Sequence, residues 1–334
     1  MVAKLSKDDL IDINGFNKDT LKKLKPYFDI DTTMDHAEDH YEWYYNLLVL
    51  AKHNLSIAHC IQHNHGPRAI MAEKFKNKNY PDFYDPTFEN TIGCYSNFKS
   101  ADSMILQDRT VTGTKQWISM VDQADYGIFI VPHKGHDQEE AYVLIDFAEV
   151  NPLIDLSYVT PLGMQIAQPG SITIDNCELP EEYILGYRKY FEPTIIYFRA
   201  KNDTDYAFIT NYLGLVTALF EDLRAYIEQT KINVEFELNK LELAVAALNM
   251  VWHNNLPSVR RTTDSPDFWR QRNTQYTMSK TVLLDLIHFA LQIFDARWTD
   301  ISSPSTQRFR DAITFCSHMK PLYRNVDEKH FVQF

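Results

Sequence analysis

The residue types best spaced for chemistry lie in the segment VTGTKQWISMVDQADYGIFIV, which runs from Val111 to Val131. Trp117 is followed by Ile118 and then by the hydroxyl of Ser119, and an apolar run typical of a strand begins at Tyr126. An indole can form a flat apolar wall, and a hydroxyl and backbone N–H groups beside it can donate hydrogen bonds. Such a set can bind a planar ring, or Trp117 can simply fill the seam between a sheet and neighbouring helices.

A second candidate for chemistry is a group of histidines in AKHNLSIAHCIQHNHG, namely His53, His59, His63 and His65. His59 and His63 share a face if this segment is a helix, as the two zinc ligands of an HExxH protease do. That motif needs a glutamate after the first histidine, whereas Cys60 follows His59 and no carboxylate lies between the two histidines. We therefore interpret the group as a polar helix face with hydrogen-bonded imidazoles, and we expect no metal site.

The composition argues against several classes of function. The chain has 334 residues, of which 45% are hydrophobic and 23% charged, and its formal net charge is -12. Because the basic residues form no cluster longer than pairs such as Lys22-Lys23, we expect no nucleic-acid partner. The apolar runs fall short of the roughly 20 residues that cross a bilayer, so we expect no membrane partner. Four scattered cysteines without a CxxC pair, and an N-terminus without an apolar leader, favour a soluble cytoplasmic protein with reduced thiols.

The elements that must position these residues change in type along the chain. In the first part, Asn17 to Phe28 and His36 to Lys74 carry apolar residues at helical spacing, with Asn54 or Ser56 and Gly66-Pro67 as expected interruptions. In the middle part, runs rich in β-branched and aromatic residues predict strands, and the polar sequence PHKGHDQEE predicts a hairpin link between two of them. The expected strands lie in Ser103 to Gly113, Tyr126 to Val131, Ala141 to Phe147 and Ser171 to Cys177, with turns at Pro161 to Gly163 and at Pro169-Gly170.

The last part of the chain predicts helices, because apolar residues recur at three- and four-residue steps. The expected helices lie in Thr204 to Met250, in Ser265 to Trp298 and from about Pro304, where Ser303 or Ser305 can cap. We therefore predict an α+β multidomain fold with an N-terminal helical domain (1–88), a middle β-barrel-like domain (89–190) and a C-terminal four-helix bundle (191–334). Helix segments such as Leu213 to Ile227 and Thr281 to Phe294 are apolar on more than one face, which favours an interface between copies of the chain.

Four motifs, in this order, resemble the acyl-CoA dehydrogenase superfamily. Ile92 to Tyr95 is similar to the segment that enters the family's middle β-domain. GTKQWIS, followed by an Ala-Asp pair and an apolar strand, is similar to the turn G-x-K-x-W-I-[ST] of that domain. PLGMQIAQPGSITIDNCELPEEYILG is similar to the segment that closes the domain. PSTQRFRDA, from Pro304 to Ala312, is similar to a helix start with the pattern E-R-x-x-R-D-A.

The resemblance implies an acyl-CoA dehydrogenase-like flavoprotein oxidoreductase with FAD or FMN as its cofactor. It implies that Trp117 forms a wall beside the flavin ring and that Ile118 and Ser119 provide hydrogen-bond donors at the ring edge that accepts hydride. Tyr95 and Phe98 stand at further positions expected to contact the cofactor. The resemblance also implies a small-molecule substrate, such as an acyl thioester, and a homodimer or homotetramer.

The sequence departs from the family pattern at several positions. CYSNFKSADS lacks the family's Gly-Ser-Asp loop and has Phe98 where a threonine is usual. Lys231 replaces an arginine and so lacks the planar fork that grips a phosphate, and Asp295-Ala296 replaces a Gly-Gly turn. Dehydrogenation of an acyl thioester needs a carboxylate that removes a proton, but Met319 stands at the usual position of the glutamate.

Three functions therefore stay open. The first is dehydrogenation of a CH–CH bond in an acyl thioester or a similar substrate. The second is that of a reduced-flavin-dependent monooxygenase, from a branch of the superfamily in which a histidine replaces the glutamate; His318 and Ser119 match its catalytic pair by position, with His63 or His65 as a further partner. The alternative role of His318 is to cap a helix end. The third function is that of a degenerate, non-catalytic relative acting as an interaction subunit.

Overall fold

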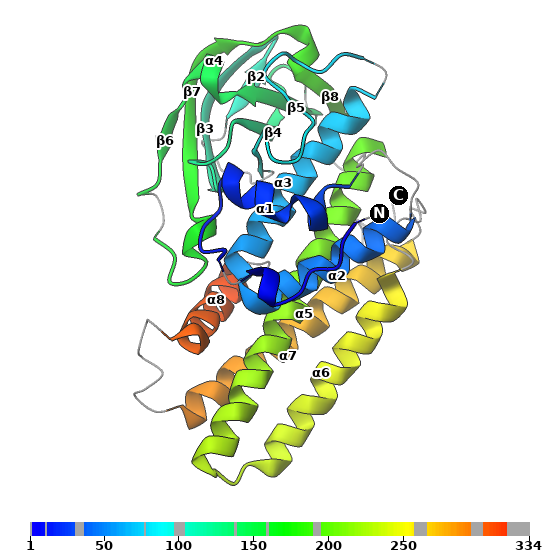
Figure 1. Cartoon of the computed structure of the whole chain (residues 1–334). Helices are drawn as coiled ribbons and strands as arrows, with labels where there is room; N and C mark the ends of the chain where they lie inside the picture. Colours follow the sequence, from blue (N-terminus) through cyan, green and yellow to red (C-terminus); the bar gives the residue numbers. More distant parts are fainter. Residues whose placement is uncertain are drawn as a thin grey trace.

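The computed structural model describes residues 2–10, 12–30, 37–76, 78–96, 104–136, 139–157, 160–189, 195–256, 266–294 and 303–318. Figure 1 shows the described elements as a layer of strands at one end, a set of long helices at the other, and helix α3 between the two. Helices come first in the chain, strands follow, and a helical bundle ends the described part, so the predicted fold class is confirmed.

The first helices are α1 (Lys18–Phe28), α2 (Ala37–His53) and α3 (Leu55–Lys74), preceded by the short 3-10 helix η1 (Asp8–Leu10). The side chain of Asn17 caps α1 by accepting a hydrogen bond from the backbone N–H of Thr20. Asn54 caps α3 in the same way, through the backbone N–H of Ile57. The predicted interruption at Asn54 is therefore confirmed.

The predicted interruption of the helix at Gly66-Pro67 is wrong, because α3 continues through both residues to Lys74. Pro67 has no N–H, so the helix loses the bond that this N–H would make to the carbonyl of His63. Packing outweighs this loss, since α3 is buried along most of its length against α2, α5 and strand β1.

Among the described residues, the strands form two four-stranded sheets. The first has the order β1-β4-β5-β8 and consists of β1 (Gly93–Ser96), β4 (Tyr126–Pro132), β5 (Glu139–Asp146) and β8 (Ile184–Lys189). The second has the order β2-β3-β7-β6 and consists of β2 (Ile105–Gln107), β3 (Thr110–Ser119), β7 (Pro169–Glu178) and β6 (Leu153–Asp155). The β1–β4 pair is parallel and the other pairs are antiparallel. Short helices connect these strands: α4 (Phe147–Val150), η2 (Gln165–Ala167) and η3 (Glu181–Tyr183).

The predicted strands lie in these sheets, but the segment expected as a strand from Ser103 to Gly113 contains the end of β2 at Gln107 and the start of β3 at Thr110, which pair as a hairpin. One expected turn is also wrong. Pro169-Gly170 does not form a turn but begins strand β7, where Gly170 pairs with Ile118 of β3. The predicted hairpin link between β4 and β5 is confirmed, and a bridge between Leu106 and His133 joins the two sheets at this corner.

The bundle consists of α5 (Ile195–Thr230), α6 (Glu235–Asn255), α7 (Pro266–Ile293) and α8 (Pro304–His318). Gly214 lets α5 approach α2 closely, because a Cβ atom there would lie 2.6 Å from the Cβ of Ala51. The apolar faces of α5 between Leu213 and Ile227 are covered largely by the chain's own helices, so they supply less interface than the sequence pattern predicts. In the described part of the chain, no helix has the length and apolar character to span a bilayer.

Candidate functional site

The Trp117 segment lies in a β-bulge of strand β3. Lys115 pairs with Ile172 of β7 and Ile118 pairs with Gly170, so the register shifts between these pairs. Trp117 occupies the bulge with a φ of 58°. This left-handed backbone conformation is rare for residues other than glycine and asparagine. A strained residue that the surrounding sheet holds in place often marks a functional position.

The bulge sets the environment of the predicted cofactor-binding residues. Ile118 and Ser119 are buried, whereas the indole of Trp117 is half-buried. Tyr95 lies half-buried on β1, and its neighbour Ser96 donates a hydrogen bond of 3.4 Å to the carbonyl of Gln116. The structure therefore brings the Tyr95 segment beside the bulge. Phe98 lies outside the described residues, so its role stays a prediction.

Ser119 forms a buried pair with a histidine of helix α3. The Oγ of Ser119 lies 3.2 Å from the Nε2 of His59, and both side chains are at most 3% exposed. From the sequence we expected His63 or His65 as a further partner beside His318 and Ser119, and we placed His59 in a polar helix face with hydrogen-bonded imidazoles. The structure shows that His59 is the histidine that contacts Ser119.

Aromatic rings from three helices surround His59. Its ring centroid lies 4.2 Å from that of His63 on α3, 5.6 Å from that of Phe208 on α5 and 5.9 Å from that of Phe315 on α8. Phe208 and Phe315 also stack on each other, with centroids 6.2 Å apart. His59 is buried, whereas His63 and Phe208 are half-buried, so this group of rings is partly exposed to solvent at His63 and Phe208.

Helix α8 is fixed to the sheet part by its Arg-Asp motif. The Oδ1 of Asp311 accepts hydrogen bonds from the backbone N–H of Met164 at 2.6 Å and from the Nε2 of Gln307 at 2.7 Å. The Nε of Arg310 donates to the carbonyl of Leu162 at 2.9 Å. Burial raises the pKa of the Asp311 carboxyl group to about 6, against the lowering effect of the Met164 and Gln307 hydrogen bonds.

His318 is the last residue of α8, three residues beyond Phe315, whose ring contacts that of His59. The end of α8 therefore approaches the His59–Ser119 pair. The side chain of His318 and all of Met319 lie outside the described part, so the catalytic role of His318 stays a prediction.

Beyond Asp205, the next carboxylate along α5 is Glu221, and it lies away from this site. Its side chain is 58% exposed and forms an ion pair with the Nζ of Lys52 at 2.8 Å. It lies thirteen residues beyond Phe208 on α5, which corresponds to about 20 Å along the helix. Lys231, at the expected phosphate-binding position, ends α5 in a left-handed conformation with an exposed side chain.

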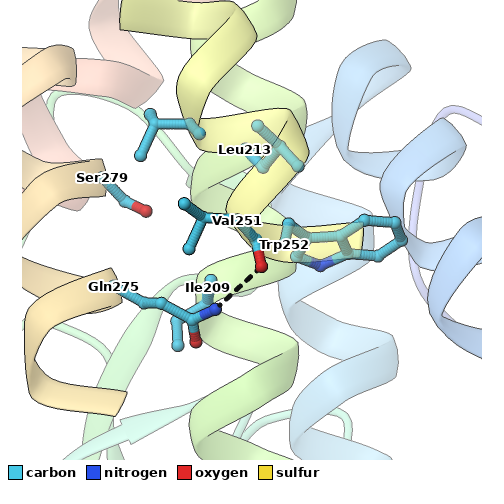
Figure 2. Close-up of a pocket in the computed structure, with 7 residues that line it drawn as sticks. Ile209, Leu213, Val251, Trp252, Gln275 and Ser279 are labelled. Atoms are coloured by element: carbon cyan, nitrogen blue, oxygen red, sulfur yellow. Dashed lines mark hydrogen bonds between the residues drawn. The ribbon is translucent and has the colours of Figure 1, made fainter. Parts of the chain in front are cut away.

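A small recess lies elsewhere, between α5, α6 and α7 (Figure 2). Its lining includes Ile209 and Leu213 of α5, and Gln275 of α7, which donates a hydrogen bond of 3.3 Å to the carbonyl of Val251. The recess has room for about one water molecule, so it is too small for a cofactor or a substrate. We therefore place the candidate site at the His59–Ser119 pair.

Comparison with known proteins identifies the fold. No model of a protein family matches the sequence, and no curated protein matches it significantly. Butyryl-CoA dehydrogenase from Megasphaera elsdenii is similar in structure, with a TM-score of 0.75 at 13% identity over 95% of this chain and 88% of that chain. Dibenzothiophene monooxygenase from Paenibacillus sp. A11-2 has a TM-score of 0.71 at 14% identity, over 98% and 90% of the two chains.

A third similar structure is that of KijD3 in complex with FMN and dTDP-3-amino-2,3,6-trideoxy-4-keto-3-methyl-D-glucose, with a TM-score of 0.70 at 14% identity over 96% of this chain and 86% of that chain. These proteins differ in the substrates that their names state, and identities this low show the fold alone. The chain has the fold of the acyl-CoA dehydrogenase superfamily, as its sequence motifs predicted.

Proposed function

We propose that this chain is a flavin-dependent oxidoreductase, and that it works as a reduced-flavin-dependent monooxygenase. The observation that carries the proposal is the buried hydrogen bond between His59 and Ser119, next to the strained bulge at Trp117. An imidazole and a hydroxyl can hold and move a proton at a site from which bulk water is excluded.

The residues around the bulge fit a flavin by their chemistry. The half-buried indole of Trp117 offers an aromatic face, and the hydroxyl of Ser119 offers a polar group at the edge of a planar ring. The complex of KijD3 shows FMN bound to a protein of this fold, and either FMN or FAD is consistent with these residues. A reduced flavin, when bound, supplies the two electrons with which one oxygen atom of O2 enters the substrate and the other leaves as water.

The chain's own residues would control protons and water in this reaction. The Nε2 of His59 shares a proton with the Oγ of Ser119, so the pair can donate a hydrogen bond, and then a proton, toward the reacting oxygen. Which of the two atoms carries the proton depends on the histidine tautomer. The rings of Phe208 and Phe315 keep the imidazole in place and exclude water from it.

The carboxylate positions favour this function over acyl thioester dehydrogenation. A dehydrogenase needs a carboxylate at the reacting carbon. Met319 occupies the usual position of this base in the sequence, and Glu221 is bound to Lys52 at the surface. An imidazole–hydroxyl pair suits protonation of an oxygen atom, and it offers no carboxylate for the removal of a carbon-bound proton.

We also propose that the chain forms a homo-oligomer through α6. Phe236, Leu243 and Met250 recur at seven-residue intervals on this helix and are 61–78% exposed. Residues at this spacing lie along one stripe of a helix. A second copy of the chain would bury the stripe.

The proposal can be tested by flavin titration of the full chain with FAD and FMN, followed by oxygen mixing. Bound flavin is reduced with dithionite without oxygen, and its reoxidation by O2 is followed by absorbance. His59→Asn and Ser119→Ala should keep flavin binding but change the reoxidation rate by about tenfold or more, because they remove a proton donor from the site. His288→Ala, at an exposed histidine of α7, is the control and should change neither quantity.

The same experiment separates the alternative functions. Equal reoxidation rates in the wild type and in Ser119→Ala would remove the assigned role of the pair. Bleaching of the bound flavin by an acyl-CoA without oxygen would assign a dehydrogenase instead. A chain that binds neither FAD nor FMN would be a non-catalytic relative.

A further inference from the structure

The hairpin between β4 and β5 brings two histidines and a glutamate together. The sequence is His133-x-x-His136-x-x-Glu139. The Nδ1 of His133 lies 2.7 Å from the Oε2 of Glu139, and the Nδ1 of His136 lies 3.7 Å from the same oxygen. One ligand atom from each of the three residues lies within 4.8 Å of the other two.

The backbone of the hairpin holds these three residues in position. The N–H of His133 donates to the carbonyl of Glu139 at 3.0 Å, the N–H of His136 to the carbonyl of His133 at 3.2 Å, and the N–H of Glu139 to the carbonyl of His136 at 3.1 Å. Gly135 turns the chain between the histidines with a φ of 90°. Each candidate ligand is thus tied to another through the main chain.

The side chains are also ordered by stacking. The rings of His133 and His136 lie nearly parallel, with centroids 4.0 Å apart and planes at 12°. The ring of Tyr187, on β8, also stacks on the ring of His133, with centroids 5.0 Å apart.

We propose that His133, His136 and Glu139 form a binding site for Zn²⁺. Two imidazole nitrogens and one carboxylate oxygen are a known three-residue ligand set for zinc, with water at the fourth position. In a tetrahedral site with zinc–ligand distances near 2.1 Å, neighbouring ligand atoms are about 3.4 Å apart. The two Nδ1–Oε2 separations of 2.7 and 3.7 Å bracket this value, and the third separation is at most 4.8 Å. A metal lies in the plane of each imidazole that binds it, so the His136 ring, which is 60% exposed, must turn out of its stack on His133 to complete the site. Mg²⁺ and Ca²⁺ prefer all-oxygen ligands and fit the set less well.

The proposed zinc site lies where the two sheets meet. His133 forms the bridge to Leu106 of β2, and the N–H of Lys134 donates to the carbonyl of Leu106 at 2.8 Å. The two sheets therefore meet at the first ligand. Bound zinc would fix the hairpin at this corner and raise the stability of the folded chain, because it binds the folded state and not the separated ligands of the unfolded chain.

The test is a Zn²⁺ titration of the full chain, stripped of metal with a chelator, in competition with a chromophoric zinc indicator. The wild type should bind one zinc ion with high affinity. His136→Ala and Glu139→Gln should each weaken binding at least about tenfold, because each removes one of three ligands. His136 is 60% exposed, so its replacement leaves the fold intact. His288→Ala is the matched control, since this histidine is also exposed and lies on α7, and it should leave the affinity unchanged.

Co²⁺ provides a second measurement, because its visible spectrum reports a tetrahedral environment with nitrogen ligands. The wild type should give this spectrum and the His136→Ala variant should lose it. Zinc should also raise the melting temperature of the wild type but not that of His136→Ala. Equal zinc affinity in the wild type and His136→Ala would overturn the proposal and leave the His133–Glu139 contact as a simple hairpin ion pair. Loss of high-affinity binding in His59→Asn, with binding retained in His136→Ala, would also overturn it.

Discussion

Replacement of Asp311 by asparagine tests how α8 is held against the sheet part. The Asp311 carboxyl group is buried, and its Oδ1 accepts hydrogen bonds from Met164 and Gln307. Burial raises its pKa from an ordinary value of 3.8 to about 6. An asparagine has the same shape and keeps an oxygen acceptor for both bonds, but it cannot ionise. The substitution therefore changes the charge and leaves the contacts of Oδ1 in place.

The direction of the pH effect follows from the raised pKa. Between pH 3.8 and about 6 the folded chain binds a proton at Asp311 more tightly than the unfolded chain does. The stabilisation from this proton is fully present below the ordinary pKa and is lost as the pH rises through the folded-state pKa. A shift of this size corresponds to about 3 kcal/mol. The unfolding free energy of the wild type, relative to that of Asp311→Asn, should fall by up to this amount across the interval.

The assay is urea unfolding of the wild type, of Asp311→Asn and of Asp155→Asn at several pH values from 3 to 7. Asp155→Asn is a control of opposite sign, because hydrogen bonds from Ser157 lower the pKa of Asp155. The wild type should lose stability relative to Asp155→Asn as the pH falls, and relative to Asp311→Asn as it rises. A constant difference between the wild type and Asp311→Asn from pH 4 to 7 would refute the assigned burial cost.

Two further substitutions test packing and assembly. Gly163→Ala should lower the free energy of unfolding in urea by about 1–3 kcal/mol, because the new Cβ would lie 2.5 Å from the backbone of Arg310. The control Gly15→Ala should be nearly neutral, since a Cβ there meets nothing within 4 Å. Equal effects of the two substitutions would contradict the close approach of α8 to Gly163. Leu243→Glu should lower the mass measured by sedimentation without reducing the stability of the folded monomer, because Leu243 is 73% exposed on the α6 stripe. An unchanged mass would remove this stripe from any interface.

The order of helices and strands could be predicted from the sequence because the hydrophobic period changes clearly along the chain. The β4 strand, for example, is a continuous run of buried β-branched and aromatic residues. The errors at Gly66-Pro67 and at Pro169-Gly170 share one cause. Glycine and proline predict interruptions from local conformation alone, whereas the burial of α3 and the pairing of β7 with β3 decide the outcome.

The candidate site could be predicted only in part, because its two halves lie far apart in the sequence. Ser119 followed from a local motif, but its partner His59 lies sixty residues earlier on another element. The available signal was the pair His59 and His63, one helical turn apart, which we interpreted as a polar helix face with hydrogen-bonded imidazoles. The hydrogen bond of His59 agrees with that interpretation, but the pattern gave no means of naming Ser119 as the partner. The spacing of His133, His136 and Glu139 is also visible in the sequence, where we interpreted the segment only as a hairpin link.

The burial of α3 also explains why His59 can be placed accurately. Polar side chains on this helix bind other parts of the fold: Ser56 accepts a hydrogen bond from the N–H of Ala167, and Asn64 accepts one from the N–H of Gly93. These contacts lie one turn on either side of His59 and fix α3 against the sheet part, while Gln62 accepts a bond from Asn211 of α5. The distance from His59 to Ser119 is thus determined by neighbours outside the proposed proton-donating pair. In the proposed monooxygenase, an imidazole held in this way would supply the proton donor in place of a carboxylate, so the chemistry would depend on this one side chain more than on the fold.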